Sequence, residues 1–149
     1  MTEKERNQKA KQWLKRYSEA KRDIARLHGE LDELTAKQEG AKAIQYTDMP
    51  RAPGVDGDLS DLFAQRDNMR RKIIKAMTKA SRIMDIVKAA IDEVPEPSVR
   101  AVLSARYIQL MKWDAISGKL DYSLPRIHQL HRAGLGDIYA IVYSHGNIT

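Results

Sequence analysis

A regular apolar stripe runs through the first third of the chain. Its positions advance in alternating steps of four and three residues, which is the spacing of a heptad repeat on one side of a helix. The side chains between them are mostly Lys, Arg, Asp and Glu, and the pattern predicts a helix over residues 3–45. Because the stripe is narrow, helical propensity alone does not hold such a helix, and it needs a partner. The stripe consists of Trp13, Tyr17, Ala20, Ile24, Leu27, Leu31 and Leu34.

A second stripe with the same spacing predicts another long helix over residues 59–94, capped by Asp58 or Ser60. The segment between the two helices, residues 46–58, contains two Pro, two Gly and three Asp, and is predicted to be a loop. Two long helices joined by a tight loop indicate an antiparallel hairpin, closed within one chain or doubled by dimerisation. We therefore expect residues 1–94 to form a helical arm. The second stripe consists of Leu59, Leu62, Met69, Ile73, Ala76, Ala80, Ile83, Val87, Ala90 and Val94.

The pattern changes after the second stripe. Pro95 and Pro97 cannot continue a helix, and the following segment, residues 98–142, is predicted to hold three short helices. The second of these, WDAISGKL, stops at Asp121, a residue type that tolerates the left-handed conformation of a tight turn. Ser123 then has the side chain of a helix N-cap. The sequence thus predicts an all-α fold, in which the arm is followed by a small C-terminal helix-turn-helix unit.

The third short helix carries the residues that we expect to bind DNA. Ile127, Leu130 and Leu135 are expected to face the core, which leaves a polar row on the outside. Arg can bond guanine through two hydrogen bonds, Gln can read adenine, and His can donate to a base or a phosphate. A polar face that contacts only solvent is the alternative. The candidate DNA-binding residues are Ser123, Leu124, Arg126, His128, Gln129, His131 and Arg132.

The charge of the chain is compatible with a polyanionic partner without requiring one. The formal net charge is +6, and the basic excess is spread over the predicted helices rather than gathered in one tail. A basic run from Arg66 to Arg82 lies on the predicted second helix. We interpret this run mainly as a solvated face, and contact with DNA phosphate or with another protein is the alternative.

Several functions are disfavoured by what the sequence lacks. The chain has no Cys, which excludes disulfides and thiolate metal sites. It has no phosphate-binding glycine loop or nucleophile motif, and His128 and His131 have no evident third metal ligand. We therefore expect no enzymatic activity, no metal and no other cofactor. No apolar run approaches the roughly 18 residues of a membrane span, and residues 1–13 lack the apolar core of a signal peptide. A cytoplasmic protein outside the membrane is expected.

The run from Met111 to Ile138 resembles the helix-turn-helix of bacterial sigma-factor region four. That family combines a Leu-x-x-Ile-x-x-x-Leu helix, a Gly-Val turn and a Ser-x-x-x-Val-x-Gln-Ile helix. Lys112 departs from it where a capping Thr is usual, and Asp121 replaces the turn Gly. Gly134 and Gly136 are expected to weaken the end of the third helix by roughly 1 kcal/mol each. The matching positions are Trp113, Ile116, Leu120, Tyr122, Ser123, Ile127, Gln129, Leu130 and Leu135.

Residues 10–138 further resemble the ArpU/RinA-like group of phage-encoded regulators of late transcription. That group has a helical arm, a Met-Pro-Arg-x-Pro linker, a second helix and a sigma-like end. The linker here, residues 48–53, reads DMPRAP and is the most specific part of the match. The resemblance implies binding of double-stranded DNA and regulation of phage late genes in the host-cell cytoplasm. It also implies contact with host RNA polymerase. From the helical arm itself we expect a dimer, which would place two recognition helices on two half-sites of DNA.

Two other functions stay open from the residues alone. A phage packaging or structural coiled-coil protein, such as a small terminase subunit, combines similar parts. Such subunits usually place the helix-turn-helix before the oligomerisation helices, and here the order is reversed. A helical adaptor that binds only protein is the other alternative.

Overall fold

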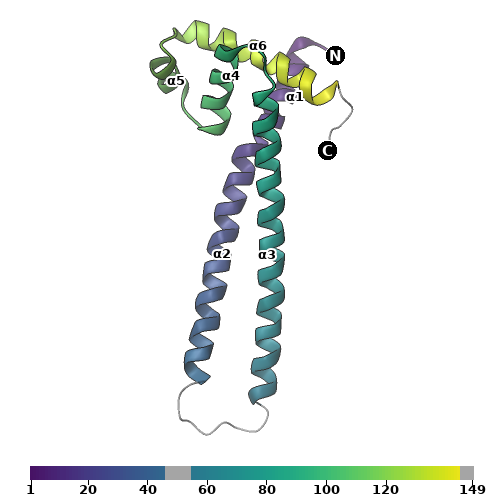
Figure 1. Ribbon diagram of the computed structural model, residues 1–149, viewed down its shortest axis with the longest axis vertical. Coiled ribbons are helices and arrows are strands. Elements are labelled where there is room, and N and C mark those ends of the chain that lie inside the picture. The colour runs from purple at the N-terminus through teal and green to yellow at the C-terminus, as the bar shows by residue number, and fades with distance from the viewer. Residues whose placement is uncertain (46–54, 145–149) are drawn as a thin grey trace. The chain divides into compact units, whose positions relative to one another are not determined.

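The computed structural model describes residues 1–45 and 55–144, and this part of the chain contains helices and no strand (Figure 1). The predicted all-α fold is confirmed. The elements are α1 (Glu3–Leu14), α2 (Arg16–Gln45), α3 (Val55–Asp92), α4 (Pro97–Leu103), the π-helical segment η1 (Ser104–Ile108), α5 (Trp113–Leu120) and α6 (Leu124–Tyr143).

The single helix predicted over residues 3–45 is broken at Lys15 into α1 and α2. A capping box starts α1, because the Thr2 hydroxyl accepts from the Glu5 backbone N–H and the Glu5 carboxylate accepts from the Thr2 backbone N–H, both at 3.2 Å. The Thr-x-x-Glu spacing that predicts such a cap is present in the sequence. Trp13 and Leu14, consecutive residues at the end of α1, are both buried. The predicted stripe includes Trp13 but not the adjacent Leu14, so the buried side of α1 is wider than predicted. This wider side lets α1 pack against a second partner.

The second long helix begins at Val55 rather than at residue 59. The loop predicted over residues 46–58 is therefore wrong for 55–58, and its remaining part lies outside the described residues. Asp58 and Ser60 lie inside α3 and do not cap it. Residues 55–58 are helical despite their loop-like composition, because local residue preferences are weak compared with the stability of the long helix that these residues extend.

The chain forms two compact units that differ from the predicted domains. The first unit comprises residues 1–21 and 82–149, and the second comprises residues 22–81. The predicted arm spans residues 1–94 and the predicted DNA-binding unit spans 98–142, so the compact units divide the chain at other positions. The reason is that apolar residues of α1 and of the last part of α3 are buried in the same core as α4, α5 and α6.

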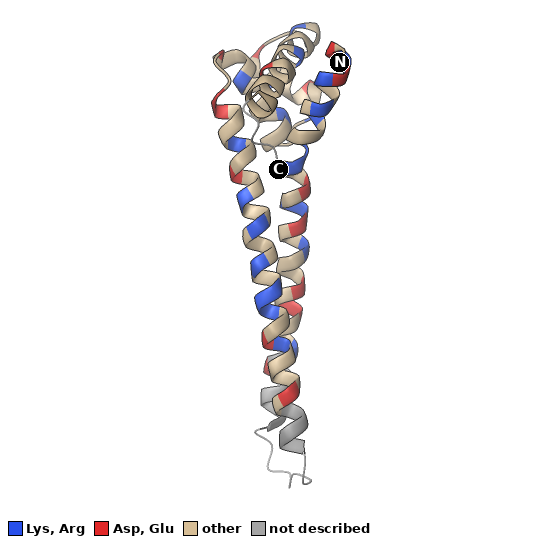
Figure 2. Cartoon of the chain, turned by 90° about the vertical axis from the view of Figure 1, so that its right-hand side faces the viewer, with Lys and Arg blue, Asp and Glu red and all other residues tan. Residues whose placement is uncertain are grey.

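The second unit consists of two antiparallel helical segments, one from α2 and one from α3, which lie side by side in both views (Figures 1 and 2). Leu27 and Leu34 of α2 are buried with Ile73 of α3, and Leu31 is half-buried beside them. The Arg66 guanidinium donates to the Lys37 carbonyl oxygen at 3.1 Å, which adds a polar link between the segments. The predicted pairing of the two stripes within one chain is therefore confirmed for this part of the arm.

The second stripe is buried over only part of its length. Leu62 and Met69, which the spacing places on it, are 38% and 53% exposed. The side chain of Leu59 lies outside the described residues. The basic residues of α3 are visible along the helix in Figure 2, and Arg71, Lys72, Lys75, Lys79 and Arg82 are exposed. Arg66 and Arg70 are half-buried.

The first unit is built around α6, against which α1 and α4 both pack. Ile127, Leu130 and Leu135 of α6 are buried, as predicted. The largest fully buried side chains of this core are Leu14, Val87, Ile91, Val94, Val99, Val102, Leu103, Ile116, Ile127 and Ile138. Helix α6 continues through Gly134 and Gly136 to Tyr143, so neither glycine ends it.

The two glycines of α6 have different surroundings, and a matched pair of substitutions should separate them. A Cβ at Gly134 would lie 2.9 Å from three side-chain carbons of the buried Leu103, whereas a Cβ at Gly136 would meet nothing within 4 Å. Gly136→Ala should raise the free energy of unfolding by about 1 kcal/mol through helix propensity. Gly134→Ala should lose this gain, because overpacking costs about 1–3 kcal/mol. Urea unfolding of both variants measures the difference, and an equal gain at both positions would contradict the close approach of α4 and α6.

Candidate nucleic-acid interface

A tight turn joins α5 to α6. Asp121 ends α5 in the left-handed conformation, with φ of 60° and ψ of 39°, as the sequence predicts. The Ser123 hydroxyl accepts from the Arg126 backbone N–H at 3.3 Å and caps α6. The Ser117 hydroxyl donates to the Tyr122 carbonyl oxygen at 2.5 Å, which ties the turn back to α5. The start of α6 is therefore held from both sides.

The exposed side of α6 begins directly at this turn. Arg126, His128, Gln129 and Arg132 are exposed, and Leu124 is 37% exposed. The Arg126 guanidinium donates to the Gln129 side-chain oxygen at 2.8 Å. A shallow hollow along this side is lined by Ser123, Pro125, Arg126, His128, Gln129 and Arg132. The candidate residues other than Leu124 and His131 therefore line one accessible surface, which we call the α6 face.

His131 lies in the core, and its predicted outward orientation is wrong. It is only 8% exposed, and its Nε2 is 2.7 Å from the Tyr107 hydroxyl oxygen. Its ring is stacked with the Tyr107 ring and meets the Trp113 ring edge-on, at centroid distances of 5.7 and 4.7 Å. His131 follows Ile127 by four residues and precedes Leu135 by four, which places it on the inward side. This spacing is the signal in the sequence that could have revealed its position.

Burial keeps the His131–Tyr107 pair uncharged. Desolvation, and to a smaller extent the nearby cationic groups of Lys11, Arg106 and His128, together lower the pKa of His131 to about 4. Desolvation raises the pKa of Tyr107 to about 12, against the opposing effect of Arg106. At neutral pH the hydrogen bond therefore joins a neutral imidazole to a neutral phenol. Its role is to fasten η1 to α6 rather than to contact a ligand.

Trp113 connects this buried pair to the α6 face. The Arg106 guanidinium carbon lies 4.3 Å from the Trp113 ring centroid, and the same guanidinium donates to the Met111 carbonyl oxygen at 3.0 Å. On its other side Trp113 contacts the ring of the exposed His128 at a centroid distance of 4.8 Å. This stack orients the first turn of α5 and restricts the His128 ring. Trp113 is one of the positions that match the sigma-like pattern, but no signal in the sequence predicts its contact with Arg106.

The described residues contain no group of three or more His, Asp or Glu side chains arranged to hold a metal ion. None of the described helices is long and apolar enough to cross a membrane.

Comparisons with protein-family models, with curated proteins and with solved structures find no match to this chain.

Proposed function

We propose that the chain is a sequence-specific DNA-binding regulator of phage late genes, which reads double-stranded DNA through a helix-turn-helix formed by α5 and α6. The observation that carries this proposal is the α6 face. A row of exposed Arg, Gln and His side chains starts within the first turn of a capped helix, immediately after a left-handed turn. In DNA-binding helix-turn-helix units, the N-terminal part of the second helix enters the major groove and contacts base edges.

Arg126 and Gln129 are the residues best placed to read bases. Both lie near the start of α6, and their 2.8 Å hydrogen bond aligns the two side chains in the absence of DNA. Arg suits the two acceptors of guanine, and Gln suits the donor–acceptor pair of adenine. Arg132 lies about two and a half turns beyond Ser123 at 3.6 residues per turn, where a side chain more often meets the sugar-phosphate backbone, and we assign it a phosphate contact.

The wider role follows from the resemblance to phage late-transcription regulators. A dimer formed through the helical arm would present two α6 faces to two half-sites on DNA. Contact with host RNA polymerase and action in the host-cell cytoplasm belong to the same proposal. The exposed apolar side chains Leu62 and Met69 of the second unit support an interface between copies, since the single chain leaves them uncovered.

Selection of DNA ligands from a random pool by the full chain tests this proposal. We expect one enriched motif. Arg126→Ala and Gln129→Ala should each lower the affinity for that motif by about 1–3 kcal/mol and relax the preference at one position. Arg132→Ala should instead weaken motif and scrambled DNA alike and reduce the salt dependence. Binding is measured by fluorescence anisotropy at several salt concentrations, after circular dichroism has shown that each variant is folded.

Lys75→Ala together with Lys79→Ala provides the control, because both lysines are exposed on α3 in the second unit. This pair should change the affinity only slightly. Absence of an enriched motif, or unchanged affinity in all three α6 variants, would refute the DNA-reading role of the α6 face and favour an adaptor that binds only protein.

A further inference from the structure

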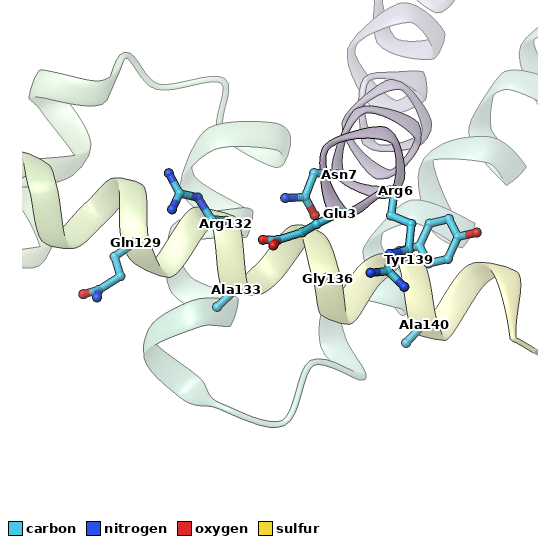
Figure 3. Close-up of a pocket in the computed structure, with 9 residues that line it drawn as sticks. All are labelled: Glu3, Arg6, Asn7, Gln129, Arg132, Ala133, Gly136, Tyr139 and Ala140. Atoms are coloured by element: carbon cyan, nitrogen blue, oxygen red, sulfur yellow. The ribbon is translucent and has the colours of Figure 1, made fainter. Parts of the chain in front are cut away.

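A hollow of about 480 Å³ extends the α6 face toward α1 (Figure 3). Its floor is formed by the small residues Ala133, Gly136 and Ala140, which lie on one side of α6 at spacings of three and four residues. Arg132 and Gln129 of the α6 face lie at one end of it, so the hollow is continuous with the proposed DNA-reading surface. The lining residues are Glu3, Arg6, Asn7, Gln129, Arg132, Ala133, Gly136, Tyr139 and Ala140.

A second hollow adjoins the first and is again formed by α1 and α6. It shares Glu3, Asn7 and Arg132 with the first, and Lys4, Gln8 and Lys11 of α1 complete it together with Leu135. The charged residues that line the two hollows are four basic side chains and one acidic side chain: Lys4, Arg6, Lys11, Arg132 and Glu3. The lining of the two hollows therefore has an excess of basic side chains over the single carboxylate of Glu3, which lies between Arg132 and Gly136 in Figure 3.

We propose that α1 forms a second DNA-binding element, which holds the sugar-phosphate backbone beside the groove that α6 reads. This inference rests on the proposed function. The DNA phosphates would run over the floor at Gly136, with Arg6 and Arg132 as their cationic partners and Asn7 as a neutral donor. The small side chains of the floor permit close approach of a backbone, and the basic rim supplies the charge complementarity that phosphate contacts require. The DNA footprint then includes residues from both ends of the described chain.

Replacement of Gly136 by Glu tests the floor of the hollow. A Cβ at this position meets no neighbouring atom within 4 Å, so a side chain can leave the helix backbone there without a clash, and Glu puts a carboxylate where the phosphates are proposed to lie. We expect at least about a tenfold loss of affinity for motif and scrambled DNA alike, because phosphate contacts carry no sequence information. Gly136→Gln, which has the same shape without the charge, should lose less.

The chain offers a matched control for this substitution. Gly29 is an exposed glycine inside α2, a Cβ there also meets nothing within 4 Å, and it belongs to the second unit. Gly29→Glu makes the same change in net charge and in helix composition. It should leave the affinity within about twofold of wild type at moderate salt, since salt screens an exposed charge that makes no contact with the DNA.

The double variant Lys4→Gln/Arg6→Gln tests the rim. Both side chains are exposed, so their loss does not disturb the core. Each phosphate contact contributes about 0.9 to the slope of log affinity against log salt, and the slope should therefore fall by about 1–2. Lys75→Gln/Lys79→Gln removes the same charge from α3 and should leave the slope unchanged.

The outcomes separate this inference from the function on which it rests. The DNA-reading role of α6 stands if wild type selects a motif and Arg126→Ala weakens binding to it. The phosphate-binding role of α1 is overturned if, in the same experiments, Gly136→Glu binds like Gly29→Glu and Lys4→Gln/Arg6→Gln leaves the salt slope unchanged. If wild type selects no motif, both proposals fall. Uniform loss in Gly136→Glu together with the reduced slope supports the inference.

Discussion

Replacing Leu14 by Ala is expected to lower the free energy of unfolding of the first unit by about 2–5 kcal/mol, the usual cost of a cavity at a fully buried leucine. Leu14 has no exposed surface and ends α1, which packs against α6. If residues 98–142 formed a domain on their own, its free energy of unfolding would not change in this variant. The chain has two tryptophans, Trp13 and Trp113, and both belong to the first unit. Tryptophan fluorescence during urea unfolding therefore reports on this unit separately.

Gln12→Ala is the matched control for Leu14→Ala. Gln12 lies on the same helix and is exposed, so its truncation should change the unfolding free energy by less than about 0.5 kcal/mol. An unchanged fluorescence transition in Leu14→Ala would contradict the burial of α1 and restore a DNA-binding unit that is independent of the N-terminal helix.

The buried imidazole of His131 should make the first unit sensitive to acid. Its pKa is about 4 in the folded protein against an ordinary value of 6.5, so the unfolded chain binds more protons between these values. Stability is therefore lost as the pH falls from about 6.5 to about 4, and the loss from this group amounts to about 3 kcal/mol. Below pH 4 this histidine contributes no further loss. The measurement is the urea midpoint of tryptophan fluorescence between pH 4 and pH 8.

His131→Gln should flatten this pH dependence while keeping a hydrogen-bond partner for Tyr107. His128→Gln, which removes an exposed imidazole, should retain most of the wild-type loss. Burial and the neighbouring Glu96 raise the pKa of Asp137, which acts in the opposite direction on acidification. Asp137 is present in all three proteins, so its effect cancels in the comparison. Equal pH dependence of wild type and His131→Gln would show that another group controls the acid transition.

The parts of the fold that were predicted correctly depend on local signals. The left-handed break at Asp121 and the cap at Ser123 follow from residue types at single positions. The helical character of the long segments follows from periodicity, as does the burial of Leu27 and Ile73. These features require no knowledge of which segments meet in space.

The parts that could not be predicted depend on which partner a stripe packs against. Periodicity marks Trp13 and Leu27 as members of one stripe, yet Trp13 is buried in the core of the first unit and Leu27 in that of the second. Met69 continues its stripe and is left exposed. For His131, residue type suggested a polar surface, but its spacing from Ile127 and the partner hydroxyl of Tyr107 decide in favour of burial.

The first unit takes residues 1–21 from the start of the chain and α6 from its far end, and this has a consequence for synthesis. During translation α1 emerges first, yet the surface that buries Leu14 does not exist until α6 has left the ribosome. Residues 22–81 can pair with one another earlier, because their contacts need only those two segments. Products truncated before α6 would keep the helical pairing of the second unit without a folded first unit. If the chain dimerises and reads DNA as proposed, such products would pair with intact chains without supplying an α6 face, and would reduce DNA binding by the intact chains.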